Sequence, residues 1–199
     1  LMQLVAYGAQ DIYLTGNPQI TFFKVVYRRH TNFSMESIKQ TFSGGGNNVV
    51  ATISRNGDLV HKMYLVGADG EADQGTIETV ELEIGGQRID RQSGDWMNTW
   101  NELSTSESKA IGLKAMTGQI GTVGSADGVH QQHIPLLFWF CRNPGLALPL
   151  IALQYHEVKV KFSLDKSNTS DLYCDYIYLD TDERRRFAQV SHEYLIEQV

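Results

Sequence analysis

Short runs of β-branched and aromatic residues, separated by Gly, Asn, Asp and Pro, recur along most of this chain and leave little room for long helices. Such runs are typical of strands about five to six residues long, joined by tight turns. The predicted strands are Gln19–Tyr27, Phe33–Phe42, Val49–Ser54, Leu59–Val66, Thr76–Ile84, Gln87–Arg91, Ile134–Cys141, Leu150–Ala152, Glu157–Leu164 and Leu172–Leu179. A chain of 199 residues with this pattern predicts one all-β domain with a substantial core.

The Gly85-Gly86 pair predicts a two-residue hairpin, because glycine adopts the positive φ that such turns require. Pairing Ile84 with Gln87 then places Glu83 opposite Arg88 and Leu82 opposite Ile89. Charges on one face and apolar side chains on the other are what a half-buried ribbon requires.

The Asn56-Gly57 pair is a second turn signal with two interpretations. As a hairpin it would set Arg55 opposite Asp58 and Ile53 opposite Val60. As a corner it would carry the chain from one sheet to another. Farther along, the apolar segment 143–155 is interrupted by Pro144, Gly145 and Pro149, which predicts a buried bend between strands.

Residues 93–133 depart from the strand pattern. Asp95 to Leu103 is compatible with a helix, Ser104 and Glu107 offer a capping box for a second helix through Met116, and a Gly- and Ser-rich stretch follows from Gly118 to Gly128. Excursions of this length inside a β domain are usually functional or mobile loops. Ser43 to Asn48 is predicted to be a loop tip.

A second capping box is predicted at Asp180 and Glu183, before a short helical turn through Arg186 and Phe187. Asp180, Asp182 and Glu183 could also bind Ca²⁺, but acidic residues at the start of a helix and arginines toward its end complement the helix dipole. The dipole interpretation is the preferred one.

The net charge of −6 argues against nucleic acid as a partner, since binding the phosphate backbone requires a basic surface. Arg28-Arg29-His30 is therefore interpreted as a solvated strand end or a subunit contact. The chain contains no apolar run long enough for a membrane helix and no signal-peptide pattern. Cys141 and Cys174 lie in apolar segments and are predicted to be buried free thiols.

Motifs for catalysis and metal binding are lacking, so we expect no enzyme activity, no cofactor and no metal site. His130 and His133 are three residues apart near a strand and would point to opposite faces. His156-Glu157 lacks the further histidines of a cupin-like metal site. Nucleophile elbows, phosphate-binding loops and dinucleotide-binding turns are also missing.

Several long segments carry a family resemblance: the opening LMQLVAYGAQDIYLTGNPQITFFKVVYRRHTNFSMESI, then ISRNGDL, VELEIGGQRID, NPGLALPLIALQYHEVKV and DYIYLDTDERRRFAQVSHEYLIEQV. They resemble the amino-terminal part of the major capsid proteins of large icosahedral double-stranded DNA viruses, the nucleocytoplasmic group that includes chloroviruses, iridoviruses and giant amoebal viruses. The resemblance extends from Gln3 to Val199.

This resemblance implies an eight-stranded jelly-roll sandwich, the first of the two in such a protein, with a helix-containing long loop. Residues 1–18 would form an N-terminal arm, 19–190 the roll, and 191–199 the start of a connection to a second roll. Leu1 is not expected to be the natural start, and the natural protein is expected to continue beyond Val199.

The same resemblance implies a structural role in the virion after assembly in the host cytoplasm. Three copies would form a pseudo-hexagonal capsomer that contacts neighbouring capsomers and minor capsid proteins, with the arm near an underlying viral membrane. The loops expected to vary among relatives are Ser43–Asn48, Ala68–Gly75, Ser93–His133 and Lys166–Asp171.

Two candidate sites follow from this interpretation. Trp96 and Trp100, four residues apart on a predicted helix, would share a face and anchor an oligomer contact; alternatively they plug the end of the roll. Asn32 and Asn168 begin glycosylation sequons. The alternative functions are a jelly-roll glycan-binding module and, more remotely, a jelly-roll metalloenzyme.

Overall fold

The computed structural model describes residues 31–67, 77–118, 132–165 and 170–199. Clustering of contacts separates Leu1–Asn32 from Phe33–Val199, and the fold described below is that of the second unit. The predicted arm at residues 1–18 and the predicted strand Gln19–Tyr27 lie outside the described residues.

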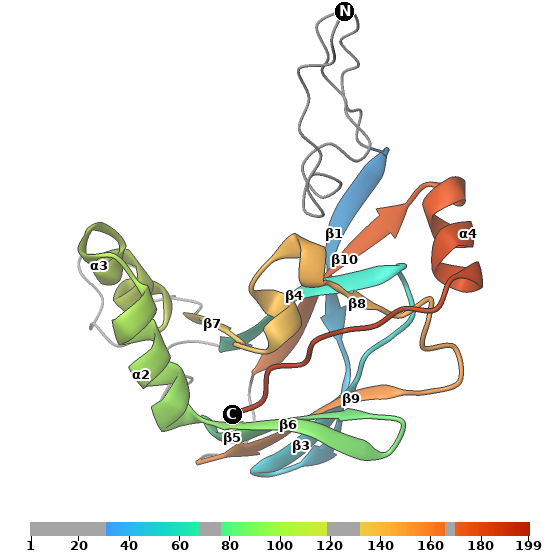
Figure 1. Cartoon of the computed structure of the whole chain (residues 1–199). Helices are drawn as coiled ribbons and strands as arrows, with labels where there is room; N and C mark the ends of the chain where they lie inside the picture. The colour runs from blue at the N-terminus through green and yellow to red at the C-terminus, as the bar shows by residue number, and fades with distance from the viewer. Residues whose placement is uncertain (1–30, 68–76, 119–131, 166–169) are drawn as a thin grey trace, which may run out of the picture. The chain divides into compact units, whose positions relative to one another are not determined.

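Two antiparallel sheets face each other (Figure 1). The first sheet has the order β1 (Phe33–Gln40), β10 (Asp171–Leu179), β4 (Leu59–Gly67) and β7 (Gln132–Pro135), with the short β8 (Leu148–Pro149) also paired to β4. The second has the order β2 (Phe42–Gly45), β3 (Asn48–Thr52), β9 (Val158–Leu164), β5 (Ile77–Ile84) and β6 (Gln87–Ser93). Four strands in each sheet interleave along the chain as in a jelly roll, with β2 and β8 as short additions. The predicted jelly-roll sandwich is confirmed.

One hydrophobic core lies between the sheets because apolar side chains alternate along the strands. In β9, Val158, Val160, Phe162 and Leu164 are buried, whereas the residues between them are partly exposed. The core cluster joins these side chains to buried residues of the first sheet, including Leu65.

The second predicted strand, Phe33–Phe42, was expected as one run, and this prediction is wrong. Thr41 separates β1, in the first sheet, from β2, in the second. The predicted loop tip also shortens, because Ser43 to Gly45 belong to β2 and the turn is Gly46-Asn47. Residues 33–42 contain no Gly, Pro, Asn or Asp, so turn chemistry gives no sign of the change of sheet.

Asn56-Gly57 forms a corner, not a hairpin, because β3 and β4 belong to different sheets. The buried Tyr176 supports this corner: its hydroxyl donates to the Ser54 carbonyl at 2.6 Å. The Gln40 side-chain oxygen accepts from the Ser54 backbone N–H at 2.9 Å. A side chain at Gly57 would bring its Cβ to 2.8 Å from the Tyr176 Cβ, so the corner needs glycine at this position.

The Gly85-Gly86 hairpin is confirmed, with φ of 61° and 84° at the two glycines. Ile84 faces Gln87 and Glu83 faces Arg88, as predicted. Leu82, however, faces Asp90 and not Ile89, since the register shifts between Leu82 and Glu83. The extra residue on β6 is a β-bulge, and it turns Asp90 inward, where only 3% of the residue is exposed.

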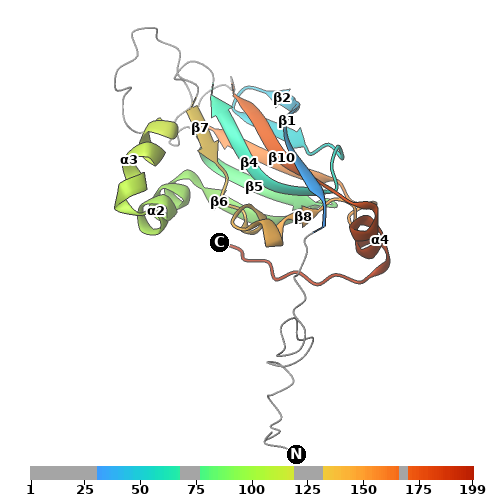
Figure 2. The same cartoon turned by 90° about the horizontal axis from the view of Figure 1, so that it is seen from above.

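Three helices are described. In α2 (Gly94–Ser104), the Ser93 hydroxyl caps the Trp96 N–H at 3.2 Å. In α3 (Glu107–Met116), the N-cap is Ser106, so the capping box predicted at Ser104 is wrong. In α4 (Thr181–Gln189), Asp180 is the predicted N-cap and accepts from the Thr181 N–H at 2.7 Å. Figure 2 shows α2 and α3 on one side of the sandwich and α4 on the other.

Two predicted strands are shorter than expected. The strand predicted over Ile134–Cys141 ends at Pro135 in β7, and Trp139–Cys141 is a 3-10 helix, η2. The strand predicted at Leu150–Ala152 is wrong, since only Leu148–Pro149 pairs. Proline cannot donate to a strand ladder, which limits both segments. The predicted bend is confirmed, but only its middle is buried: a second 3-10 helix, η3 (Pro144–Leu146), is exposed and is followed by the buried Leu148 and Leu150.

Candidate assembly surfaces

The two tryptophans of α2 lie together, as their spacing predicted. The Trp96 and Trp100 ring centroids are 5.8 Å apart, and both side chains are partly buried. The Arg142 guanidinium lies 4.7 Å from the Trp100 ring centroid and also forms an ion pair with Glu197. The aromatic pair therefore joins α2 to the residues after η2 and to the C-terminal segment. The Trp96 Nε1 is buried and has no partner among the described residues.

Beside this pair, the α2–α3 helices expose apolar side chains to solvent. Leu103 is 77% exposed and Ile111 is 73% exposed. In the residues described for α3, no side chain is buried. Exposed apolar side chains mark a surface that a partner covers when they form a contiguous patch, so this helix pair is a candidate for such a surface.

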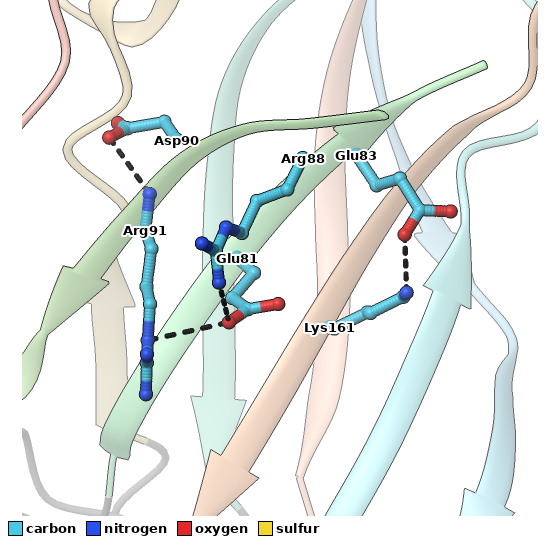
Figure 3. Close-up of polar contacts among 6 residues, drawn as sticks. All are labelled: Glu81, Glu83, Arg88, Asp90, Arg91 and Lys161. Atoms are coloured by element: carbon cyan, nitrogen blue, oxygen red, sulfur yellow. Dashed lines mark hydrogen bonds and ion pairs between the residues drawn. The ribbon is translucent and has the colours of Figure 1, made fainter. Parts of the chain in front are cut away.

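The outer face of the second sheet carries a network of charges (Figure 3). Glu81 on β5 lies between two arginines of β6, with its Oε1 3.4 Å from Arg88 Nη1 and 3.3 Å from Arg91 Nε. On its other flank β5 pairs Glu83 with Lys161 of β9. The two arginine side chains are more than half exposed, whereas that of Glu81 is only 26% exposed. The positive charges therefore lie on the outside of this network, although the protein as a whole is acidic.

An apolar groove of ≈ 500 Å³ lies between the sandwich and the segment that follows α4. Ile84, Trp139 and Leu148 line it from the sandwich, and Tyr194 and Ile196 line it from that segment. Figures 1 and 2 show this segment returning from α4 across the molecule toward β6.

The structure places the two sequons differently. Asn32 is exposed just before β1. Asn168 lies outside the described residues, as does most of the stretch 118–128. Among the described residues, no helix has the length and apolar character needed to cross a bilayer.

The acidic residues considered for Ca²⁺ binding lie at the start of α4, and His130 lies outside the described residues. No group of three or more His, Cys, Asp or Glu side chains converges in the part of the chain that the structure describes. Asp180 caps α4, and Asp182 and Glu183 lie in its first turn, as the dipole interpretation predicted. Cys141 and Cys174 are buried free thiols, and burial raises the pKa of Cys141 to about 12.

Sequence reasoning missed three residues that organise these surfaces: Asp58, Asp90 and Arg142. Asp58 binds the end of β10 and Arg184 of α4. Asp90 has two local partners on its own strand, Arg91 and Gln92. All other partners of the three residues lie more than 40 residues away in the sequence. No local spacing could have found them; the only local signal is that Asp58 directly follows a turn dipeptide.

Comparisons with known proteins agree with this architecture. Residues 21–180 match the family model described as the major capsid protein N-terminus. The major capsid protein of Pyramimonas orientalis virus is 57% identical across this whole chain, which covers 58% of that relative. The major capsid protein of Paramecium bursaria Chlorella virus 1 is 47% identical across the whole chain, which covers 52% of it.

The fold is shared with a solved capsid protein as well. The VP54 structure of PBCV-1, as fitted into a cryo-EM reconstruction of the virophage Sputnik, has a TM-score of 0.76 at 43% sequence identity. That match covers 89% of this chain and 50% of VP54. The chain thus spans little more than half the length of these relatives. Its jelly roll, its family match and its relatives together show that this chain belongs to the major capsid protein family of large DNA viruses.

Proposed function

We propose that this chain forms the first jelly roll of a structural protein that assembles into trimeric, pseudo-hexagonal capsomers and tiles an icosahedral shell. The observation that carries the proposal is the jelly roll itself, shared with VP54 at a TM-score of 0.76. A sandwich with one continuous core provides a rigid wall, and its loops can change without disturbing that wall.

In this proposal, residues 1–18 are an N-terminal arm, 19–190 the roll and 191–199 the start of a connection to a second roll. The arm would lie near a membrane beneath the shell, and the roll would contact neighbouring capsomers and minor capsid proteins. The protein would act in the virion without catalysis, after assembly in the host cytoplasm.

Trp96 and Trp100 are the proposed anchors of a contact within the trimer. Arg142 covers Trp100 from within the same chain, and both rings keep partly exposed surface. Partly exposed aromatic side chains beside the exposed Leu103 form a surface suited to an interface core. The alternative is that the pair only fixes α2 against the roll.

The solution mass of the full-length parent protein tests the assembly proposal. Light scattering on a sizing column should give a trimer for the parent and a folded monomer for its W96A/W100A variant. Tyr155→Ala, which alters a side chain that is 93% exposed away from the helix pair, is the matched control and should stay trimeric.

This experiment tests both the assembly of the trimer and the role of the two tryptophans in it. A monomeric wild-type parent would overturn the assembly proposal. A trimeric double variant would remove the tryptophans from the interface, and loss of the folded circular-dichroism spectrum would support the purely internal role.

Asn32 and Asn168 remain proposed glycan acceptors. Asn32 has the exposure that a glycan requires. Mass spectrometry of peptides from purified virions should find a glycan at each site, and unmodified peptides at both would contradict the proposal.

A further inference from the structure

Asp90 is a buried carboxylate that pairs with no cation among the described residues. Removing a carboxylate from water is costly unless hydrogen bonds replace the lost hydration. Asp90 receives them from three N–H groups. These donors are the Arg91 backbone at 2.9 Å, the Gln92 side chain at 2.8 Å and the Val199 backbone at 3.2 Å. The third donor comes from a segment more than 100 residues away.

Gln92, two residues farther along β6, is only 2% exposed. Its Nε2 donates to Asp90 and also to the Leu137 carbonyl, at 3.1 Å. Both partners are acceptors, which fixes the orientation of the amide. Its Oε1 is then a buried acceptor without a partner in the described residues. The Asp90 carboxylate and the Gln92 Oε1 are therefore acceptors that the N–H groups of β6 do not fully satisfy.

The position of this pair on the sheet makes it accessible to another segment. β6 is the edge of the second sheet, and Asp90 follows the bulge. Edge strands present unpaired backbone groups that an extended segment can satisfy. Here the Ile89 carbonyl accepts from the Gln198 side chain, directly beside the contact between Asp90 and Val199.

The residues leading to this contact alternate as an extended segment does. Tyr194 and Ile196 line the apolar groove, whereas Leu195 between them is 83% exposed. Burial raises the pKa of Tyr194 above its ordinary value. Glu197 then pairs with Arg142, so the segment is held by the apolar groove in its middle and by polar contacts at its end.

We propose that Asp90, positioned by Gln92, forms with the Ile89 carbonyl a docking site for an extended segment, and that residues 197–199 occupy it. Residues 190–199 are then a strap across the groove, and Asp90 is the positioning residue that holds its far end. The strap lines one side of the groove, opposite Ile84, Trp139 and Leu148, and directs the chain along the edge of β6. This inference concerns one copy of the chain and does not depend on capsomer assembly.

Hydrogen exchange measured by mass spectrometry tests the strap directly. Asp90→Ala should speed exchange of the Val199 N–H, which it leaves without an acceptor, by about ten- to a hundredfold, the range expected for a lost hydrogen bond to a charged group; the peptide that ends at Val199 reports it. Asp90→Asn keeps an acceptor oxygen and should give a smaller increase. Asp182→Ala, at an 87% exposed aspartate of α4, is the matched control and should leave the strap unchanged.

Two variants of the strap itself keep the test decisive if Asp90→Ala fails to fold. Glu197→Gln and Gln198→Ala remove contacts from the segment and leave the sandwich intact. Each should loosen residues 190–199 without changing the melting temperature by more than a few degrees. Equal exchange in the wild type and in folded Asp90→Ala would overturn the proposal, and so would unchanged exchange in both strap variants.

Discussion

Tyr176 shows how a single residue fixes the route of the chain between sheets. Its ring lies against Gly57, and its hydroxyl binds Ser54, so one side chain of β10 holds the corner between β3 and β4. Burial raises the pKa of this hydroxyl to about 12, although the hydrogen bond to Ser54 acts in the opposite direction. Cys141, and Cys174 beside β4, are buried weak acids whose pKa values are also raised.

We predict that stability falls as the pH rises above about 9. Unfolded thiols and tyrosines lose their protons near pH 8.5 and 10, whereas burial raises the pKa of both Cys141 and Tyr176 in the folded chain to about 12. Between these limits the unfolded state binds fewer protons, so each such group lowers the free energy of unfolding by about 1.4 kcal/mol per pH unit. Below pH 8 both states are protonated and these groups cause no pH dependence.

Urea unfolding at pH 8, 9.5 and 11 measures this slope. Tyr176→Phe should be less stable than wild type at pH 8, because the Ser54 carbonyl loses its donor, and should show a shallower decline above pH 10. An identical decline in both proteins would mean that Tyr176 ionises normally in the folded state.

Among the elements, the β5–β6 hairpin shows two reasons for glycine at a turn: a positive φ and close packing against a neighbour. Gly85 and Gly86 both have positive φ, but they differ in their surroundings. A Cβ on Gly85 would lie 2.6 Å from His156 Nδ1, whereas nothing lies within 4 Å of a Cβ on Gly86. Only Gly85 is therefore required for close packing as well as for backbone conformation.

We predict that Gly86→Ala costs about 1 to 2 kcal/mol, the usual penalty for a left-handed alanine. Gly85→Ala should cost more, because His156 must also move. Adding His156→Ala to Gly85→Ala should restore stability to the level of Gly86→Ala, measured as the midpoint of thermal unfolding. Equal losses in the two single variants would contradict the close approach.

The same elements show what local sequence can and cannot predict. Periodicity and turn chemistry predicted the β5–β6 hairpin as far as Glu83 and Arg88, because both act within a few residues. The bulge at Ile89 depends on the inward turn of Asp90, whose third donor is at Val199. Likewise, a spacing of four residues placed Trp96 beside Trp100, but Arg142 and its link to Glu197 are tertiary contacts. Neither could be read from a local pattern.

For the molecule as a whole, Asp58 joins segments that are far apart in the sequence. Its carboxylate accepts from the Leu179 N–H at 2.8 Å and lies 3.0 Å from Arg184 Nε. Its backbone binds Ile177 and Ile151, at 3.1 and 3.2 Å. The end of β10, the start of α4 and the bend after β8 therefore share one buried residue.

We predict that Asp58→Ala lowers the free energy of unfolding by about 1.5 to 3 kcal/mol, mainly because it leaves the Leu179 N–H without its charged acceptor. Arg184→Ala should cost less than about 1 kcal/mol, because the arginine side chain is 57% exposed. A double-mutant cycle from urea unfolding measures their coupling. Equal losses from the two single variants would show that the backbone contact contributes little.

The change of sheet at Thr41 has a mechanical consequence. With one residue between β1 and β2, the chain has no slack with which the two sheets could move apart at that edge. The corner at Asn56-Gly57, held by Tyr176, restrains the sandwich at a second place. Separating the two sheets would require strands to break their hydrogen bonds to neighbouring strands. The sandwich should therefore resist bending, and it should fail by breaking sheet hydrogen bonds and not by gradual separation of its layers.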